Sequence, residues 1–214
     1  MKKIGVFDSG IGGKSVANAI EKAMPEVEVV FLSDPEHLPY GTKTPDELKE
    51  LVRPKILELV ASGAEVIVIA CNTVSTTIID WIRELVNVPV IGVEPMLEEA
   101  SKLSRSKVIT VCATPTTLGS KRYHDLKQQY AEGATVIEPD CSRWTRMIED
   151  NQVDREEIFE RIDSACQKGA DVIVLGCTHY HWIEELISQI ANGRAEVIHP
   201  EAKVIEQVRA ILNT

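Results

Sequence analysis

Short apolar runs alternate with amphipathic stretches along the chain. The apolar runs are rich in β-branched residues and poor in charge, which is typical of strands buried on both faces of a parallel sheet. They predict strands at Ile4–Phe7, Val27–Leu32, Glu65–Ala70, Pro89–Val93, Val108–Cys112, Thr135–Ile137 and Asp171–Leu175. Helical spacing between them predicts helices at Lys14–Ala23, Pro45–Ser62, Thr73–Val86 and roughly 117–131, 154–168 and 180–192. This alternation predicts an α/β fold with parallel sheets.

The two halves of the chain also resemble each other. Residues 63–73 read GAEVIVIACNT and residues 169–180 read GADVIVLGCTHY, which aligns Cys71 with Cys177 at a shift of 106 positions. The same shift aligns residues 27–34 with 133–140, and a shift of 104 aligns residues 3–10 with 107–114. A tandem pair of similar units is therefore expected.

We expect two similar α/β/α lobes related by pseudo-twofold symmetry. Lobe 1 comprises residues 1–96 plus 199–214, the latter an amphipathic helix that can pack on either half, and lobe 2 comprises residues 97–198. Ligands of open α/β sheets bind outside the carboxyl ends of the strands, where Asp8, Cys71 and Cys177 fall. With such symmetry both cysteines would face one cleft between the lobes, and we expect the active site there.

Composition narrows the function classes. A formal charge of −10 argues against nucleic acid or an anionic membrane surface as a partner. No stretch approaches the roughly 18–20 apolar residues of a membrane-spanning helix, and MKKIGVFDSGIGG reads as a first strand rather than a signal peptide. The five cysteines are scattered, with no disulfide framework and no CxxC or HxxxH metal spacing. We expect a cytoplasmic protein with free thiols and no bound metal.

Cys71 and Cys177 differ from the other cysteines in their setting. Each ends an apolar strand and precedes polar residues, NT and THY, where loop amides and a helix N-terminus lower a thiol pKa from about 8.5 toward neutrality. Two such thiols on opposite faces of one carbon can remove a proton from one side and deliver one to the other. The remaining cysteines are expected to be small buried hydrophobes: Cys112, Cys141 and Cys166.

Two further residues fit acid–base chemistry. Asp8 opens the glycine-rich DSGIGG turn (8–13), which matches neither GxGxxG nor the P-loop pattern, and it can serve as helix cap, catalyst or both. His179 lies two residues after Cys177, where an imidazolium would stabilise a thiolate or relay its proton. No functional context surrounds the other histidines, His37, His124, His181 and His199.

Polar turns at other strand ends have two readings. LPYGTKT (38–44) is explained as a plain turn, and CNTVSTT (71–77) and ATPTT (113–117) supply hydroxyls and one amide. These groups either cap helices or cradle carboxylate and ammonium groups.

Together the motifs resemble those of the glutamate racemases, within the cofactor-independent aspartate/glutamate racemase superfamily. GVFDSGIGG (5–13), LPYGTKT (38–44), ACNT (70–73), GVEP (92–95), ATPTT (113–117) and GCTHY (176–180) occur in the family's order and span nearly the whole chain.

The resemblance implies a two-lobed enzyme that interconverts L- and D-glutamate without pyridoxal phosphate or metal and supplies D-glutamate for peptidoglycan. Cys71 and Cys177 would be the two bases, assisted by Asp8 and His179. Family members commonly dimerise, so a homodimer is expected, with a small amino acid as the other partner. The implied substrate-binding residues are Ser9, Pro39, Tyr40, Gly41, Asn72, Thr73, Thr114, Thr117, Glu149 and Thr178.

The chain also departs from the family pattern. After Cys141 the family usually has a mostly apolar, proline-containing stretch leading to a glutamate, whereas this chain reads CSRWTRMIE and keeps Glu149. Arg143 and Arg146 in that stretch either bind a larger or more anionic substrate or form a solvated helix face. His181 and Trp182 replace a usual proline and aliphatic residue, and the chain is shorter than most family members.

Rival functions remain open at this point. They are a racemase of aspartate or another carboxylate-bearing amino acid, a related cis–trans isomerase, and a non-catalytic dicarboxylate-binding paralogue. His179 favours glutamate over aspartate, because the aspartate branch usually has an acidic residue there. The presence of both strand-end cysteines argues against the single-cysteine decarboxylases, and their wide separation argues against a thiol–disulfide oxidoreductase.

Overall fold

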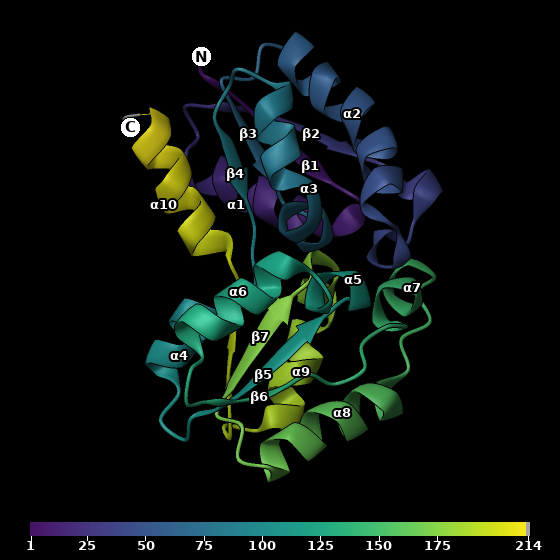
Figure 1. The fold of residues 1–214 in the computed structure, drawn as a ribbon, viewed down its shortest axis with the longest axis vertical. Coiled ribbons are helices and arrows are strands. Elements are labelled where there is room, and N and C mark those ends of the chain that lie inside the picture. Colours follow the sequence, from purple (N-terminus) through teal and green to yellow (C-terminus); the bar gives the residue numbers. More distant parts are fainter. Residues whose placement is uncertain (213–214) are drawn as a thin grey trace. The chain divides into compact units, whose positions relative to one another are not determined.

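The computed structural model describes residues 1–212, and their contacts divide them into two compact units. The first unit comprises Met1–Glu94 and the C-terminal segment that begins at Pro200; the second comprises Pro95–His199. Each unit contains one four-stranded sheet whose strands are all parallel (Figure 1). The predicted α/β fold is therefore confirmed. Residues 213 and 214, which the sequence placed in lobe 1, lie outside the described residues.

The sheet of the first unit has the strand order β2-β1-β3-β4. Side chains alternate between its two faces, as they must along a strand: Ile4 and Val6 face one helix layer, and Phe7 faces the other. Helices α1 and α10 cover one face, and α2 and α3 cover the other (Figure 1). The bounds are β1 Lys3–Asp8, β2 Glu28–Ser33, β3 Val66–Ile69, β4 Val90–Gly92, α1 Lys14–Ala23, α2 Pro45–Ala61, α3 Asn72–Leu85 and α10 Glu201–Leu212.

The C-terminal helix α10 belongs to the first unit. Val204, Val208 and Leu212 follow one another at intervals of four residues, so they share one helix face and are buried in the core beside α1. The amphipathic pattern predicted the helix, and although it could pack on either half, the sequence analysis assigned it to lobe 1.

The second unit repeats the same strand order as β6-β5-β7-β8. Helices α4 and α6 cover one face of this sheet, and α8 and α9 cover the other together with the short helix α7 (Figure 1). The bounds are β5 Val108–Ala113, β6 Thr135–Ile137, β7 Val172–Gly176, β8 Glu196–Ile198, α4 Leu97–Leu103, α5 Pro115–Leu118, α6 Lys121–Tyr130, α7 Trp144–Glu149, α8 Arg155–Gln167 and α9 Glu184–Ala191.

Strand register corrects the sequence alignment of the two halves. Ile4 pairs with Val66 in the first sheet, and Ile109 pairs with Val172 in the second. Because residues 66 and 172 are equivalent at a shift of 106, β1 matches β5 at a shift of 105, not the predicted 104. A one-residue slip exchanges the two faces of a strand, so the sheet register decides the match.

The corrected register changes the equivalences at the strand ends. Ser9, not Asp8, corresponds to a polar residue of the second unit, namely Thr114, and Asp8 corresponds to Ala113. The two units therefore repeat a hydroxyl residue after the first strand of each sheet, whereas the carboxylate of Asp8 has no counterpart at that position.

Two predicted helices are built differently. The region 117–131 contains α5 and then α6, because Ser120 interrupts the first helix and caps the second by accepting a hydrogen bond from the Tyr123 N–H at 3.1 Å. The region 180–192 begins with a 3₁₀ helix, Thr178–Ile183, before α9 starts at Glu184. The elements α4, α7 and β8 were not predicted.

Candidate active site

Cys71 lies at the carboxyl end of β3, directly before the first residue of α3. Its carbonyl accepts from the Ser75 N–H at 2.9 Å, so the cysteine is the N-cap of a 14-residue helix. The side chain is 5% exposed. The helix start that the sequence predicted after Cys71 is therefore present, and a helix N-terminus is a setting that stabilises negative charge.

Ser9 stands beside this thiol, and Asp8 precedes Ser9 in the glycine-rich turn. The Cys71 thiol donates to Ser9 Oγ at 3.6 Å, and the Gly10 N–H donates to Asp8 Oδ2 at 3.0 Å. Gly13 leaves space for this arrangement, because a Cβ on it would stand only 2.3 Å from the Asp8 Cβ. The glycine-rich turn thus folds tightly against a buried carboxylate.

The LPYGTKT turn brings Tyr40 into the same cluster. Tyr40 shares a hydrophobic core with Cys71, and its phenol donates to Asp34 Oδ2 at 2.7 Å. Burial first, and then the Asp34 carboxylate, raises the pKa of Tyr40 far above its usual value, so the phenol stays protonated. Gly41 is also buried, and Pro39 is half-buried before it.

Asp34 was missed by the sequence reading. It is buried at the end of β2, and His37 Nδ1 lies 2.8 Å from its Oδ1. The signal was present in the spacing D-x-x-H-x-x-Y, which places three hydrogen-bonding side chains on one tight turn, but that spacing is not specific to a function.

Asn72 has an unusual environment. Its side chain is 3% exposed, yet neither its Oδ1 nor its Nδ2 has a hydrogen-bond partner among residues 1–212. A buried amide normally makes such bonds, because leaving it unpaired costs about 1–3 kcal/mol. Beside a strand-end thiol, an amide with one free acceptor and two free donors fits a ligand. Thr73 follows it, equally buried.

Cys177 occupies the equivalent position in the second unit, at the end of β7. It is 8% exposed and precedes the 3₁₀ helix Thr178–Ile183 instead of an α-helix. The helix-dipole argument therefore applies more weakly to Cys177 than to Cys71, since a short 3₁₀ segment aligns fewer peptide dipoles. Thr178, buried, begins that segment.

A histidine–carboxylate pair lies beside Cys177, where the 3₁₀ segment offers a weaker helix dipole. His179 Nδ1 lies 3.8 Å from the Cys177 sulfur, and His179 Nε2 lies 2.5 Å from Glu149 Oε1. A carboxylate at Nε2 favours the tautomer with its proton there, which leaves the Nδ1 lone pair toward the thiol. Glu149, predicted to bind substrate, therefore also orients His179. Residues 149 and 179 are far apart in the sequence, so no spacing pattern reveals this pairing.

Thr114 and Cys177 directly follow the paired strand ends Ala113 and Gly176, and Thr117 lies in the helix α5 that Thr114 caps. The Thr114 hydroxyl donates to Thr117 Oγ1 at 3.0 Å and accepts from the Thr117 N–H at 3.3 Å. Helix capping, one of the two readings of ATPTT, is thus present for α5.

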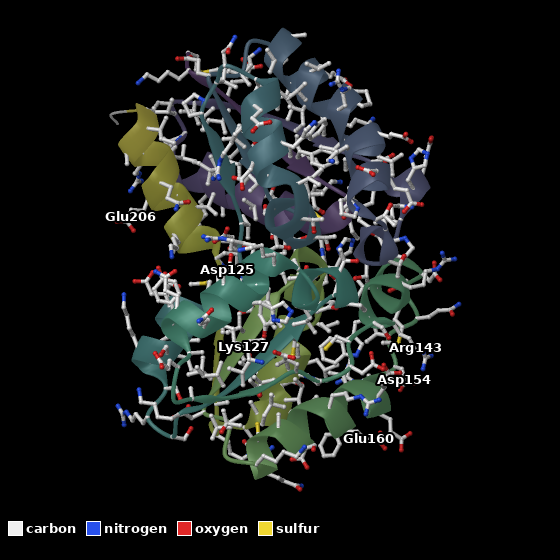
Figure 2. All side chains as sticks on the ribbon, in the orientation of Figure 1. Asp125, Lys127, Arg143, Asp154, Glu160 and Glu206 are labelled. Carbon is white, nitrogen blue, oxygen red and sulfur yellow. The ribbon has the colours of Figure 1, made fainter. Side chains whose placement is uncertain are left out.

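Arg143 and Arg146 form a solvated face of α7. Arg143 pairs with Glu157 at 2.7 Å and Arg146 with Asp150 at 2.7 Å, and both guanidinium side chains are about two-thirds exposed, at 68% and 67%. Figure 2 shows Arg143 at the periphery of the second unit. The structure favours the solvated-face alternative over a second anion site.

The remaining cysteines and histidines have structural settings. Cys112, Cys141 and Cys166 are buried, which confirms the prediction, and burial raises the pKa of the Cys141 thiol well above its usual value. His181 and His199 stack edge-to-face at 5.9 Å and both lie near Glu184. Among residues 1–212 no group of three or more His, Cys, Asp or Glu side chains is arranged to hold a metal ion, and no helix there is long and apolar enough to cross a membrane.

Comparison with known proteins agrees with this arrangement. A sequence model of the Asp/Glu/Hydantoin racemase family matches residues 12–212. Glutamate racemase of Methylococcus capsulatus is 36% identical over 210 residues, covering 96% of this chain and 78% of that protein. Glutamate racemase from Aquifex pyrophilus gives a TM-score of 0.76 at 32% identity, covering 97% and 83% of the two chains. The enzyme from Francisella tularensis, in complex with D-glutamate, gives 0.83 at 27% identity, covering 99% and 81%.

The chain belongs to the Asp/Glu/Hydantoin racemase family and is an isomerase of the racemase class. Within that family, the relatives compared here are glutamate racemases, which confirms the resemblance seen in the motifs.

Proposed function

We propose that the protein interconverts L- and D-glutamate by α-proton transfer between two cysteines, without a cofactor. The observation that carries the proposal is the repeated strand-end thiol: Cys71 after β3 and Cys177 after β7, at equivalent positions of two units with the same strand order. The names of the relatives support glutamate as the substrate, and the Francisella tularensis relative holds D-glutamate.

Inversion at an α-carbon needs a base on one face and an acid on the other. In the proposed reaction a thiolate removes the α-proton, and the other cysteine, as a thiol, donates its proton to the opposite face. The first cysteine ends as a thiol and the second as a thiolate, so the protons balance and no oxidant is needed. Reversal of the roles converts the other enantiomer. The proposal therefore requires one thiol from each unit at a single α-carbon.

The neighbours of each thiol suit this exchange in different ways. At Cys177, His179 can accept the thiol proton at Nδ1 while Glu149 stabilises the resulting imidazolium. At Cys71, the start of α3 and the Ser9 hydroxyl stabilise the thiolate, and we assign Asp8 the assisting role on this side. The two bases are thus equivalent in position but differently supported.

Asn72 is the best-supported substrate ligand. Its unpartnered Nδ2 can donate to a carboxylate, while its Oδ1 can accept from an ammonium group, which matches the two charged groups of an amino acid. We infer that the remaining polar groups bind the rest of the substrate: Ser9, Pro39, Tyr40, Gly41, Thr73, Thr114, Thr117 and Thr178.

The proposal has a cellular context. D-Glutamate produced in this way would supply peptidoglycan synthesis, and the free thiols fit the reducing conditions of the cytoplasm. We also propose a homodimer, which size-exclusion chromatography with light scattering would test.

Chiral chromatography tests the proposed function directly. Purified protein incubated with L-glutamate should produce D-glutamate until the two are equal, and the reverse reaction should reach the same mixture. Inversion of aspartate but not of glutamate would support the two-cysteine reaction and change the assigned substrate to aspartate. Binding of glutamate without inversion of any acidic amino acid would contradict the proposal and favour a binding protein.

A further inference from the structure

Each strand-end thiol has a hydroxyl partner, but the two hydroxyls come from different places. The Cys71 sulfur lies 3.6 Å from Ser9 Oγ, on the turn after β1. The Cys177 sulfur lies 3.8 Å from Thr145 Oγ1, on helix α7. The residue equivalent to Ser9 in the second unit is Thr114, which caps α5. The repeat therefore reaches the same pairing of sulfur and hydroxyl by a second route.

Thr145 belongs to the stretch CSRWTRMIE, most of which forms helix α7. Unlike the two arginines of that stretch, which face solvent, Thr145 is 7% exposed. An apolar residue at this place could fill the same volume, but it could not hydrogen-bond to sulfur. Thr145 thus places one buried hydroxyl group within reach of Cys177.

Hydrogen-bond direction at Thr145 depends on the protonation of the sulfur. Burial keeps Tyr180 protonated by raising its pKa well above the usual value, and its phenol donates to the Cys141 carbonyl at 3.0 Å. As a thiol, Cys177 can donate to Thr145 or to His179. As a thiolate it can only accept, and the Thr145 hydroxyl then becomes a donor to it.

We propose that Thr145 is a positioning residue that donates a hydrogen bond to the thiolate of Cys177, the role that the proposed function gives the Ser9 hydroxyl when Cys71 is the thiolate. This inference rests on the proposed function, in which Cys177 is one of the two bases. Thr145 stabilises the charged form of the sulfur and holds it in place between the hydroxyl and the imidazole. The hydroxyl adds stabilisation of the thiolate at Cys177, where a six-residue 3₁₀ segment follows instead of the 14-residue α-helix that follows Cys71.

A comparison of the racemisation rates in the two directions cannot show which of the two cysteines Thr145 affects. Because the equilibrium constant between two enantiomers is one, kcat/KM must be equal in both directions for every variant at every pH. The state of each thiol has to be read separately. Alkylation by iodoacetamide across a pH series, quantified by mass spectrometry of the two cysteine-containing peptides, gives an apparent pKa for each sulfur in the full-length protein.

The variants are Thr145→Val, which keeps the shape and removes the hydroxyl, and Thr145→Ser, which keeps the hydroxyl. We expect Thr145→Val to raise the apparent pKa of Cys177 by about one unit, the size expected for loss of one charge-assisted hydrogen bond. Cys71 should titrate as in the wild type, and Thr145→Ser should restore Cys177. Ser9→Ala is the matched control and should shift Cys71 alone.

Thr145→Ala replaces the valine variant if the latter does not fold, as judged by circular dichroism. A Cys177 titration that coincides with the wild type in a folded variant without the hydroxyl would overturn the proposal, as would an equal shift of both sulfurs. These readouts involve no substrate. A wild type that fails to racemise glutamate would contradict the proposed function, while the titration would still report on Thr145.

Discussion

Glu149 Oε1 lies 2.5 Å from His179 Nε2, and the other ring nitrogen of His179 faces the sulfur of Cys177 at 3.8 Å. The imidazole is 1% exposed, so its orientation is fixed by these two contacts and by packing. A carboxylate and an imidazole thus line up with the thiol of Cys177, whereas Cys71 lies at a helix N-terminus. The two halves of the molecule thus repeat the position of the thiol but not the groups that surround it.

Replacement of His179 tests this chain. We expect His179→Asn to lower kcat on the order of 10²-fold, because the thiol loses its proton acceptor. Glu149→Gln should cost less, roughly 10- to 100-fold, as loss of a carboxylate that orients a histidine does in metal sites. Steady-state kinetics by chiral chromatography measures both. The exposed His124→Asn is the control, and a His179 variant as active as this control would remove the imidazole from the mechanism.

Gly13→Ala tests the placement of Asp8. The added methyl would lie 2.3 Å from the Asp8 Cβ, so the turn or the carboxylate must move. A displacement near 1 Å of a catalytic group can cost about 10²-fold in rate, and we expect a loss of that order. Gly119→Ala is the matched control, because its nearest contact would be the Pro115 carbonyl at 3.3 Å and its φ of −82° suits alanine. Equal activity of the two variants would show that Asp8 tolerates displacement.

Asp171 makes stability depend on acid pH. Burial tends to raise its pKa, but hydrogen bonds from Ser104, Ser106 and Arg105 outweigh burial and lower it to about 2. The unfolded value is about 3.9, so this stabilisation is complete above that pH and is lost as the pH falls toward 2. Asp171→Asn should therefore reduce the free energy of unfolding by about 1–3 kcal/mol at pH 7.

Urea denaturation at pH 7 and at pH 3 measures this difference. The difference in free energy of unfolding between wild type and Asp171→Asn should be smaller at pH 3, because part of the Asp171 carboxylate is then protonated in the unfolded wild-type chain. The control is Asp125→Asn, which breaks an exposed pair with Lys121 and should change stability by less than about 1 kcal/mol. A gap that is equal at the two pH values would contradict the assigned role of Asp171.

Replacement of Arg143 and Arg146 is expected to leave activity nearly unchanged. Both are exposed and each pairs with a carboxylate of the second unit, so their joint replacement by alanine should leave kcat/KM with glutamate within about threefold of the wild type. Stability should change by less than about 1 kcal/mol for each pair. A large rise in KM would instead show that these guanidinium groups bind substrate.

The sequence predicted most of the strands because buried parallel strands have a strong local signature. Thr135–Ile137 and Lys14–Ala23 agree with the structure at both ends. The short helix Leu97–Leu103 and strand Glu196–Ile198 were missed, since a few residues give too little periodicity to register. The break at Ser120 was also missed, because one serine that caps a helix looks like any polar residue of a longer one.

The candidate site was predicted less completely. Residues marked by motifs, such as Cys71 and His179, fall at strand ends as expected. Partners that depend on distances through the fold had no specific signal in the sequence: Thr145 reaches Cys177 from a separate helix, and Asp34 accepts a hydrogen bond from Tyr40 at the end of β2. The register between the two halves could be assigned only from the strand pairing in the sheets, because a single-residue slip in a short apolar strand leaves its apolar pattern nearly unchanged.

The most direct test of the two-thiol reaction is the position of deuterium at low conversion. L-Glutamate is incubated with the protein in D₂O, the enantiomers are separated, and NMR or mass spectrometry measures the label at each α-carbon. If one thiol takes the proton and the other supplies a different one, D-glutamate should be almost fully deuterated while the recovered L-glutamate keeps its protium. D-Glutamate that retains protium would mean that a single group carries the proton across, and would contradict the two-thiol account.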